Sequence, residues 1–327
     1  MFVGVFSVEL MTDVSGGLCS DGLVLDWVSF TLHAGSTSQL LKVVEILFGS
    51  KIVELDKGMY GYDHSGIILG CGRVAWSSVR EDMGVHVSLP SKALGLLRDV
   101  YSSIVELFDC LRGFGATFTR LDFALDDFQG LISIDNVVDH VVSGQYVSRF
   151  KEVRRDMSLT SGGDCLYFGS RSSDSFLRIY DKRAEQIKKG VPESELPKHW
   201  VRVELEFKGQ NSDSVASSII ENGVGIVPGL FRNYVDFKVR GQDSHKSRWV
   251  PAYWWVEFLK FAERCKLSLP KVQQTVEGIK RWLVRQVAPS LHFLVELEGG
   301  SVDYLYGLLD SGRGRLNAFH LAMLGCT

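Results

Sequence analysis

The sequence lacks the cysteine patterns that mark zinc sites and disulfide frameworks. Its six cysteines are spread over 327 residues, with no CxxC pair and no cluster of cysteine with histidine. A small disulfide-stapled secreted domain is therefore excluded, and the composition fits a reducing cytoplasm.

Long apolar runs and a basic leader are also missing. No stretch approaches the roughly 18 apolar residues that a membrane span needs. The apolar start, residues 1–6, has no basic residue before it and soon reaches Glu9 and Asp13, unlike a signal peptide. We therefore expect a soluble protein that does not bind membranes.

A global excess of positive charge is absent too. The formal net charge is −3, so any contact with nucleic acid has to come from local basic patches. Residues 145–190 carry ten Lys or Arg against six Asp or Glu, a local excess of +4. A second basic segment covers residues 231–250. A solvated charged surface explains these counts as well as DNA binding does.

The pattern of apolar residues divides the chain. At 45% hydrophobic residues, it can bury a sizeable core. We predict an N-terminal extension at 1–20, an α+β domain at 21–245 and a helical C-terminal domain at 246–327. The α+β domain reads as a duplicated antiparallel sheet with helices on one face, built of halves at about 21–130 and 131–245.

The expected elements follow from periodicity and turn residues. In the first half we predict a strand at 26–32, a helix at 38–48, hairpin strands at 60–72 and 73–78, a strand at 83–89 and a helix at 91–113. In the second half we predict a helix at 134–143, a basic strand at 150–155, hairpin arms at 167–170 and 176–182, and a helix at 183–189.

A short motif occurs once in each half. Residues 120–125 read Arg-Leu-Asp-Phe-Ala-Leu, and residues 202–207 read Arg-Val-Glu-Leu-Glu-Phe. Because side chains alternate along a strand, each motif places its polar residues on one face and its apolar residues on the other. The polar sets are Arg120, Asp122 and Asp126 in the first motif and Arg202, Glu204 and Glu206 in the second.

The segment 176–182 alternates in the same way and places Arg178, Tyr180 and Lys182 on a common face. Carboxylate oxygens suit Mg²⁺ or Mn²⁺, and a phenol beside cations can act as a nucleophile once its phenolate is favoured. This pattern predicts metal-assisted phosphoryl transfer, with Tyr180 as the nucleophile and the two cations as electrostatic support. The competing interpretation is structural, because half-buried strands pair Arg with carboxylates across neighbours, and alternation alone favours it.

Other residues are assigned supporting roles. We predict that basic side chains contact the DNA backbone, namely Arg120, Arg149, Lys151, Arg154, Arg155, Arg171 and Arg202. His86 could reach the same surface, although a lone histidine is more often a structural hydrogen-bond partner.

Taken together, the motifs resemble those of the replication initiation factor family. The resemblance rests on segments 120–127, 167–173, 176–182, 201–205, 84–89 and 282–291. The family comprises rolling-circle initiators of Gram-positive plasmids, filamentous phages and integrative elements. The match runs from about Asp26 to near the C-terminus.

The resemblance implies an origin-specific enzyme that nicks and rejoins DNA. Its tyrosine, matched by Tyr180, becomes attached to the 5′ phosphate, and acids matching Asp122 and Glu204 hold a divalent metal. Asp126 and Glu206 are further ligand candidates. The implied substrate is replicon origin DNA with a single-stranded or extruded nick site. The expected setting is a bacterial host cytoplasm with a host helicase and polymerase, and a homodimer is left open.

Two other classes of function stay open. A metal-dependent nuclease could use the same carboxylates with water as its nucleophile. Alternatively, a non-catalytic origin-binding regulator could keep the fold with an inactive site.

Overall fold

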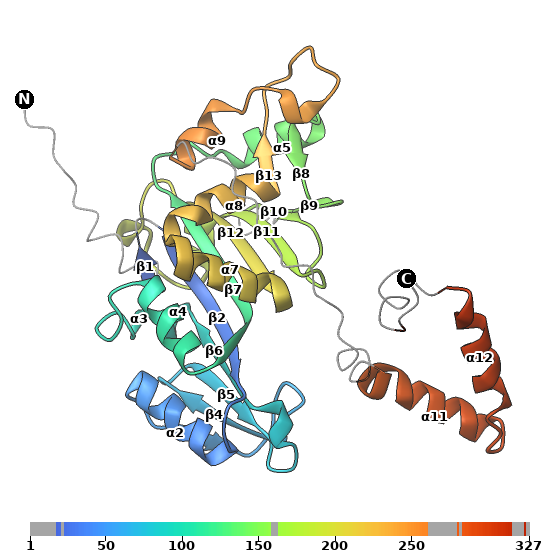
Figure 1. Cartoon of the computed structure of the whole chain (residues 1–327). Helices are drawn as coiled ribbons and strands as arrows, with labels where there is room; N and C mark the ends of the chain where they lie inside the picture. The colour runs from blue at the N-terminus through green and yellow to red at the C-terminus, as the bar shows by residue number, and fades with distance from the viewer. Residues whose placement is uncertain are drawn as a thin grey trace, which may run out of the picture. The chain divides into compact units, whose positions relative to one another are not determined.

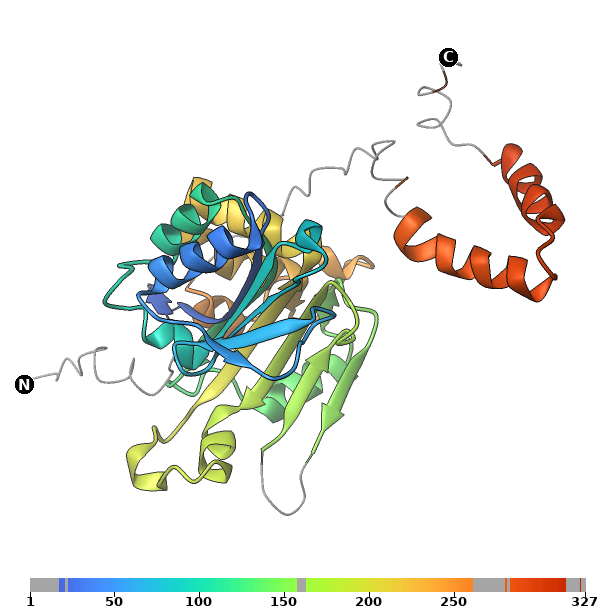
Figure 2. The same ribbon diagram turned by 90° about the horizontal axis from the view of Figure 1, so that it is seen from below.

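The computed structural model describes residues 18–20, 23–157, 163–260, 280, 283–315 and 324. Its contacts divide the chain into two units, Met1–Leu269 and Pro270–Thr327. In the first unit, helices pack on one face of a large antiparallel sheet (Figures 1 and 2). The α+β class predicted from the sequence is confirmed.

The sheet contains eleven strands, all paired antiparallel. Its strands are β1 (Leu18–Ser20), β2 (Leu23–Leu32), β3 (Val53–Leu55), β4 (His64–Ile68), β5 (Gly72–Trp76), β6 (Val85–Pro90), β7 (Ala116–Asp127), β9 (Val153–Asp156), β10 (Cys165–Phe168), β11 (Ser175–Asp181) and β12 (Val201–Lys208). The spatial order is β3-β4-β5-β6-β2-β7-β12-β11-β10-β9, with β1 paired to β2. A separate ribbon pairs β8 (Tyr146–Ser148) with β13 (Val235–Phe237).

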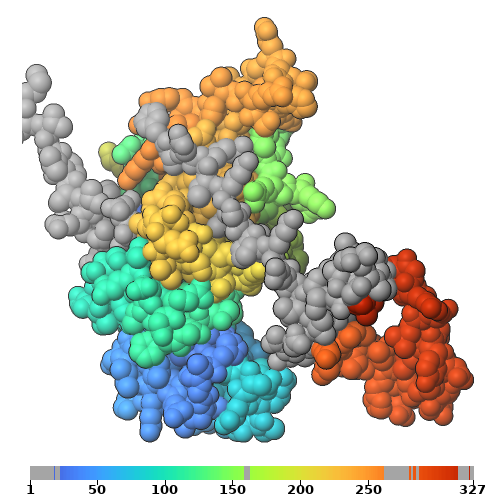
Figure 3. All heavy atoms as spheres, in the orientation of Figure 1, coloured from blue at the N-terminus to red at the C-terminus, as the bar shows by residue number. Residues whose placement is uncertain are grey.

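Most helices of the first unit cover the apolar side of the sheet, whereas α6 (Lys182–Lys188) follows β11 and buries only Lys182. The other helices of this unit are α2 (Thr37–Phe48), α3 (Ser91–Gly95), α4 (Ile104–Gly113), α5 (Ile134–Val142), α7 (Gly209–Asn222), α8 (Val227–Tyr234) and α9 (Tyr253–Phe258). Helix α7 packs across β7 and β12 at the centre of the sheet, and in Figure 3 its atoms cover the sheet on the viewer's side. Phe118, Phe123 and Phe207 are fully buried in the core between these layers.

The helices differ from the sequence-based prediction in several places, and α8 is among those not predicted. The helix expected at 91–113 is broken into α3 and α4, because Ser103 caps a new helix by accepting a hydrogen bond from the Glu106 N–H. Helix α7 was not predicted, since its serine-rich sequence has few apolar residues to reveal a helical period. Val215, Ala216 and Ile219 nevertheless bury one side of it.

The two Arg-acid strands, β7 and β12, lie side by side at the middle of the sheet. Outward from this pair, the second half is a simple meander of β12, β11, β10 and β9. In the first half, β2 lies between β7 and β6 instead. The two halves therefore meet at their matching motifs but differ in strand order.

The first α-helix after residue 246, α9, packs against the core of the first unit. Trp255 is fully buried, and its ring lies 5.1 Å from that of Phe237. These aromatic contacts place α9 in the first unit, past the domain boundary expected at 246. Of the expected extension at 1–20, the described residues 18–20 form β1.

The second unit is helical in its described part. A π-helical turn (Leu283–Val287) leads into α11 (Ala288–Leu297), with Pro289 in the first turn, and α12 (Asp303–Arg313) follows. In the described part of the chain, no helix is both long enough and apolar enough to span a membrane.

Candidate active site

The face of the sheet opposite the core is polar, and we call it the polar face. Its centre is formed by Arg120, Asp122 and Asp126 of β7, Arg202, Glu204 and Glu206 of β12, and Arg178 and Tyr180 of β11. The strand register aligns these residues in rows across the sheet. Tyr180 lies opposite Arg202, which lies opposite Asp126, while Glu206 lies opposite Asp122.

Three carboxylates gather on the polar face. Asp122 and Glu206 are directly opposed, and Glu204 is two residues from Glu206 along β12. Arg120 binds both oxygens of Asp122, at 2.6 and 2.8 Å, and also reaches Glu206 at 3.0 Å. Arg178 binds both oxygens of Glu204 at 2.6 Å. We call Asp122, Glu204 and Glu206 the acid cluster.

Each acid of the cluster is paired with a cation, since Lys208 binds the other oxygen of Glu206 at 2.7 Å. Burial raises the pKa of Asp122 to about 7, and the nearby charges of Glu204 and Glu206 act in the same direction, against the effect of Arg120. Burial likewise raises the pKa of Glu204. Such a group of buried acids has a high affinity for positive charge.

Tyr180 lies at the border of the acid cluster. Its hydroxyl donates a hydrogen bond to Oε2 of Glu204 at 3.4 Å and accepts one from Nζ of Lys182 at 3.3 Å. The guanidinium carbon of Arg178 lies 4.9 Å from the centre of its ring. The phenol oxygen is thus placed between an acid and an ammonium group.

The surroundings of Tyr180 oppose its ionisation in the absence of other ligands. Burial raises its pKa, and so does the charge of Glu204, while Arg202 and Arg178 lower it. Since Tyr180 is only 7% exposed, its phenolate depends on the cations around it.

Arg202 is enclosed rather than available to a ligand. It is fully buried, and its guanidinium binds both oxygens of Asp126, at 2.8 and 2.7 Å, and one oxygen of Asp26 at 2.8 Å. Trp200 donates a further hydrogen bond to Asp126 at 2.7 Å. Asp126 is therefore engaged in a structural clamp, and Arg202 does not reach the surface where DNA would lie.

Alternation separates the basic residues expected to contact DNA. Arg154 shares the polar face with Tyr167, 5.0 Å from its ring, and Arg171 lies 5.9 Å from the same ring. Arg155 points to the opposite face and pairs with Asp135 of α5. Arg149 packs on Tyr234, and Lys151 is exposed in the loop before β9.

His86 lies away from this site. It is on β6, separated from β11 by β2, β7 and β12. Its Nδ1 contacts the Thr31 hydroxyl at 3.0 Å, and burial lowers its pKa to about 4. The structure does not bring it to Tyr180, which agrees with a structural role.

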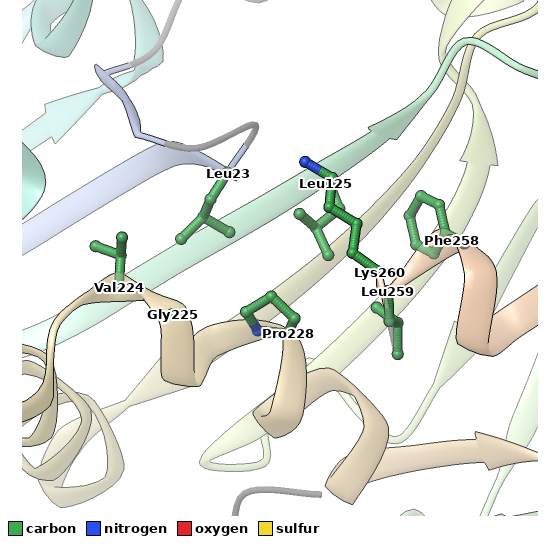
Figure 4. A pocket seen from close by; sticks show the side chains of 8 residues that line it. All are labelled: Leu23, Leu125, Val224, Gly225, Pro228, Phe258, Leu259 and Lys260. Atoms are coloured by element: carbon green, nitrogen blue, oxygen red, sulfur yellow. The ribbon is translucent and has the colours of Figure 1, made fainter. Parts of the chain in front are cut away.

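A small cavity of about 60 Å³ lies elsewhere in the first unit. Figure 4 shows that apolar side chains line it, including Leu23, Leu125, Val224, Pro228 and Phe258. Without a carboxylate in its lining, this cavity is unsuited to metal or phosphate chemistry, and the polar face remains the candidate active site.

Comparison with known proteins agrees with this geometry. The family described as replication initiation factor matches residues 116–309, a range that includes β7, β11 and β12. The chain belongs to the replication initiation factor family. A Bacillus subtilis (strain 168) protein named "Putative DNA relaxase NicK" is 24% identical over 288 residues, covering 84% of this chain and 81% of that protein.

A solved structure is similar to this member of the family. The rolling circle replication initiator protein from Geobacillus stearothermophilus aligns with a TM-score of 0.61 and 29% identity, over 76% of this chain and 98% of that one. The large antiparallel sheet with its helices is thus the fold of a rolling-circle initiator.

Sequence patterns did not reveal three residues that hold the site together. Trp200 precedes the second motif, and Glu185 pairs with Lys182 at 2.5 Å. Asp26 is the extra residue of a β-bulge, because Leu25 and Trp27 pair with the consecutive residues Phe123 and Asp122. Of these three residues, only Asp26 had a signal in the sequence, because it is an acid in an otherwise apolar strand.

Proposed function

We propose that this protein is a rolling-circle DNA replication initiator that nicks one strand at a replicon origin and later rejoins it. Tyr180 is the proposed nucleophile and forms a 5′-phosphotyrosine intermediate. The observation that carries this proposal is the position of its hydroxyl, hydrogen-bonded to Glu204 and Lys182 beside the acid cluster. We assign the chemistry to the first unit, which contains all of these residues.

The acid cluster is the proposed site for Mg²⁺ or Mn²⁺. Its oxygens are the hard ligands that these ions prefer, and burial, together with the charges of Glu204 and Glu206, raises the pKa of Asp122, an effect that a bound cation would oppose. In the described part of the chain, no three acidic, histidine or cysteine side chains are already arranged as metal ligands. Binding therefore requires Arg120, Arg178 and Lys208 to share the carboxylates or release them.

The donor set thus fits the ion chemically, with Asp122, Glu204 and Glu206 as the proposed ligands. A divalent cation bound there would polarise the scissile phosphate and offset charge on its oxygens. Asp126 is left out of this set because Arg202, which holds both of its oxygens, is fully buried, whereas the Arg120 and Arg178 side chains are 34% and 29% exposed.

The chain's own residues supply the rest of the proposed mechanism. The Tyr180 oxygen attacks the phosphorus in line with the departing 3′ oxygen, and Arg178 and Lys182 stabilise the charge that develops. The product has a free 3′ hydroxyl that can prime a host polymerase after a host helicase opens the duplex. Because the phosphotyrosine ester conserves the bond energy, rejoining needs no ATP.

The substrate strand has to be single-stranded or extruded to lie on the face of a sheet. Arg154 is exposed on β9, one strand beyond the neighbour of β11, and Arg171 is exposed in the turn between β10 and β11. We propose that both follow the DNA backbone toward the site. This reaction on replicon DNA places the protein in the cytoplasm of its host cell.

The test uses supercoiled replicon DNA with Mg²⁺ and a denaturing gel. The unchanged protein should give nicked DNA with covalently attached protein, and Tyr180→Phe should bind DNA but give neither product. Tyr167→Phe is a matched control on the neighbouring strand and should retain the adduct. Nicked DNA without attached protein would instead identify a nuclease that uses water, and unchanged topology would identify a non-catalytic origin-binding protein.

A further inference from the structure

An ion pair between the buried Lys182 and Glu185, whose side chain is 33% exposed, lies on the side of Tyr180 away from the acid cluster. Lys182 is 8% exposed, and its Nζ lies 3.3 Å from the Tyr180 oxygen and 2.5 Å from Oε2 of Glu185. Both members of the pair come from the first turn of α6, which follows β11 directly. Glu185 has no role in the mechanism described so far.

We propose that Glu185 is a positioning residue of the nicking and joining reaction, holding the Lys182 ammonium in place, and charged, against the oxygen of Tyr180. This inference rests on the proposed function, because it assumes that the Tyr180 oxygen is the reacting atom. Glu185 itself acts only through Lys182.

The charges around Lys182 show why Glu185 is needed to keep its ammonium group protonated. Burial lowers the pKa of Lys182, and so does neighbouring Arg202, whereas Glu185 and Asp26 raise it. Asp26 already pairs with Arg202 at 2.8 Å, so Glu185 is the acid in direct contact with the ammonium group.

Glu185 is itself held as an anion. Lys182 and Lys189 outweigh the effect of burial and lower its pKa to about 2. Lys189 binds the other oxygen of Glu185 at 2.9 Å and is more than half exposed. The negative charge beside Lys182 is therefore present over the whole neutral and alkaline range.

The positive charge of Lys182 acts on the Tyr180 oxygen in both nicking and joining. In nicking, the Tyr180 oxygen bonds to phosphorus, the bond from phosphorus to the 3′ oxygen breaks, and the phenol proton is transferred, in net terms, to that 3′ oxygen. In joining, the 3′ hydroxyl attacks phosphorus and the Tyr180 oxygen leaves with the electron pair. The Lys182 ammonium offsets this negative charge until the proton returns.

The experiment compares the pH dependence of nicking and joining in the full-length protein. An oligonucleotide carrying the nick site is used with Mg²⁺, between pH 6 and pH 10. Without the charge of Glu185, Lys182 loses its proton at lower pH. In Glu185→Gln, the alkaline limb of both rates should therefore move down by about one pH unit, with about a tenfold loss of kcat on that limb and little change in KM.

Three further variants separate this role from simple stabilisation. Lys189→Met removes only the exposed partner of Glu185 and should keep the profile of the unchanged protein. Lys182→Arg carries a charge that is not lost in this pH range. Adding Glu185→Gln to Lys182→Arg should therefore leave the alkaline limb of the pH–rate profile in place. If Glu185→Gln fails to fold, Glu185→Asp replaces it, and its longer contact should give a smaller downward shift.

The inference is overturned by an alkaline limb that stays in place in Glu185→Gln, or in Glu185→Asp where that variant replaces it. An equal loss of rate at every pH overturns it as well, because that result describes a structural brace. A shift in the Lys182→Arg background would exclude action through the lysine. Failure of the proposed function is distinguishable, since Tyr180→Phe, assayed in parallel, would then still nick the DNA.

Discussion

The hydroxyl of Tyr180 donates a hydrogen bond to Oε2 of Glu204 over 3.4 Å, from one antiparallel strand to the next. This contact joins the proposed nucleophile to the acid cluster, and the rigid pairing of β11 with β12 fixes it. The site thus lies on the central strands of the sheet, where strand register sets the positions of its groups.

Arg202 should be among the most important residues for stability. Replacing it by Met leaves Asp126 and Asp26 without their buried partner, and we expect a loss of about 3–5 kcal/mol in the free energy of unfolding. Urea denaturation measures this loss. Arg80→Met, which breaks the exposed pair with Asp82, should cost less than about 1 kcal/mol. Equal costs would show that the clamp is not a structural element.

The raised pKa of Asp122 predicts a pH-dependent stability in the absence of metal. Between about pH 4 and the folded-state pKa of about 7, the unfolded state loses this proton while the folded state keeps it. Rising pH therefore destabilises the folded state through this window. Asn cannot ionise, so Asp122→Asn should gain stability relative to the unchanged protein across the window, by roughly 3–4 kcal/mol at most.

Urea unfolding at pH 4.5 and pH 7.5 in a chelator tests this prediction for Asp122. A stability difference between variant and unchanged protein that is the same at both pH values would contradict it.

Metal binding should be visible as thermal stabilisation. At about 100 times its dissociation constant, Mg²⁺ should stabilise the folded protein by about 2.7 kcal/mol. Glu204→Gln should greatly reduce this gain, because it removes one proposed ligand charge. Glu193→Gln, on an exposed side chain, is the control and should keep the gain. A full response to Mg²⁺ in Glu204→Gln would remove Glu204 from the ligand set.

Neighbouring arginines on β9 should differ in their contribution to DNA binding. Arg154 lies on the polar face and Arg155 on the opposite one. Arg154→Ala should weaken binding of single-stranded DNA and reduce the dependence of log affinity on log salt by about 0.7, the value for one phosphate contact on a single strand. Arg155→Ala should leave that slope unchanged. Equal slopes in the two variants would place the DNA elsewhere.

Alternation along the strands predicted the central part of the site. Strict period-two patterns in 120–125 and 202–207 put the acids on one face, and the structure pairs those two strands directly. Alternation could not distinguish a proposed ligand such as Glu204 from a clamped acid such as Asp126. That difference depends on which arginine each acid meets, and therefore on strand order and register.

Other features depended on tertiary structure alone. The β-bulge that turns Asp26 toward Arg202 leaves no mark in hydrophobic periodicity. Glu185 was predicted to lie in the helix at 183–189. Only the turn from β11 into α6 places it beside Lys182. Trp254 and Trp255 fall in the range predicted as a separate helical domain, but their packing on Phe237 assigns them to the first unit.

The most direct test of the account is to identify the residue that carries the DNA. After reaction with origin DNA and Mg²⁺, nuclease and trypsin digestion should leave a nucleotide on the peptide between Arg178 and Lys182, Ile179-Tyr180-Asp181-Lys182. Mass spectrometry should place the added mass on Tyr180. A nucleotide on another residue, or efficient nicking with no modified peptide, would contradict the central claim.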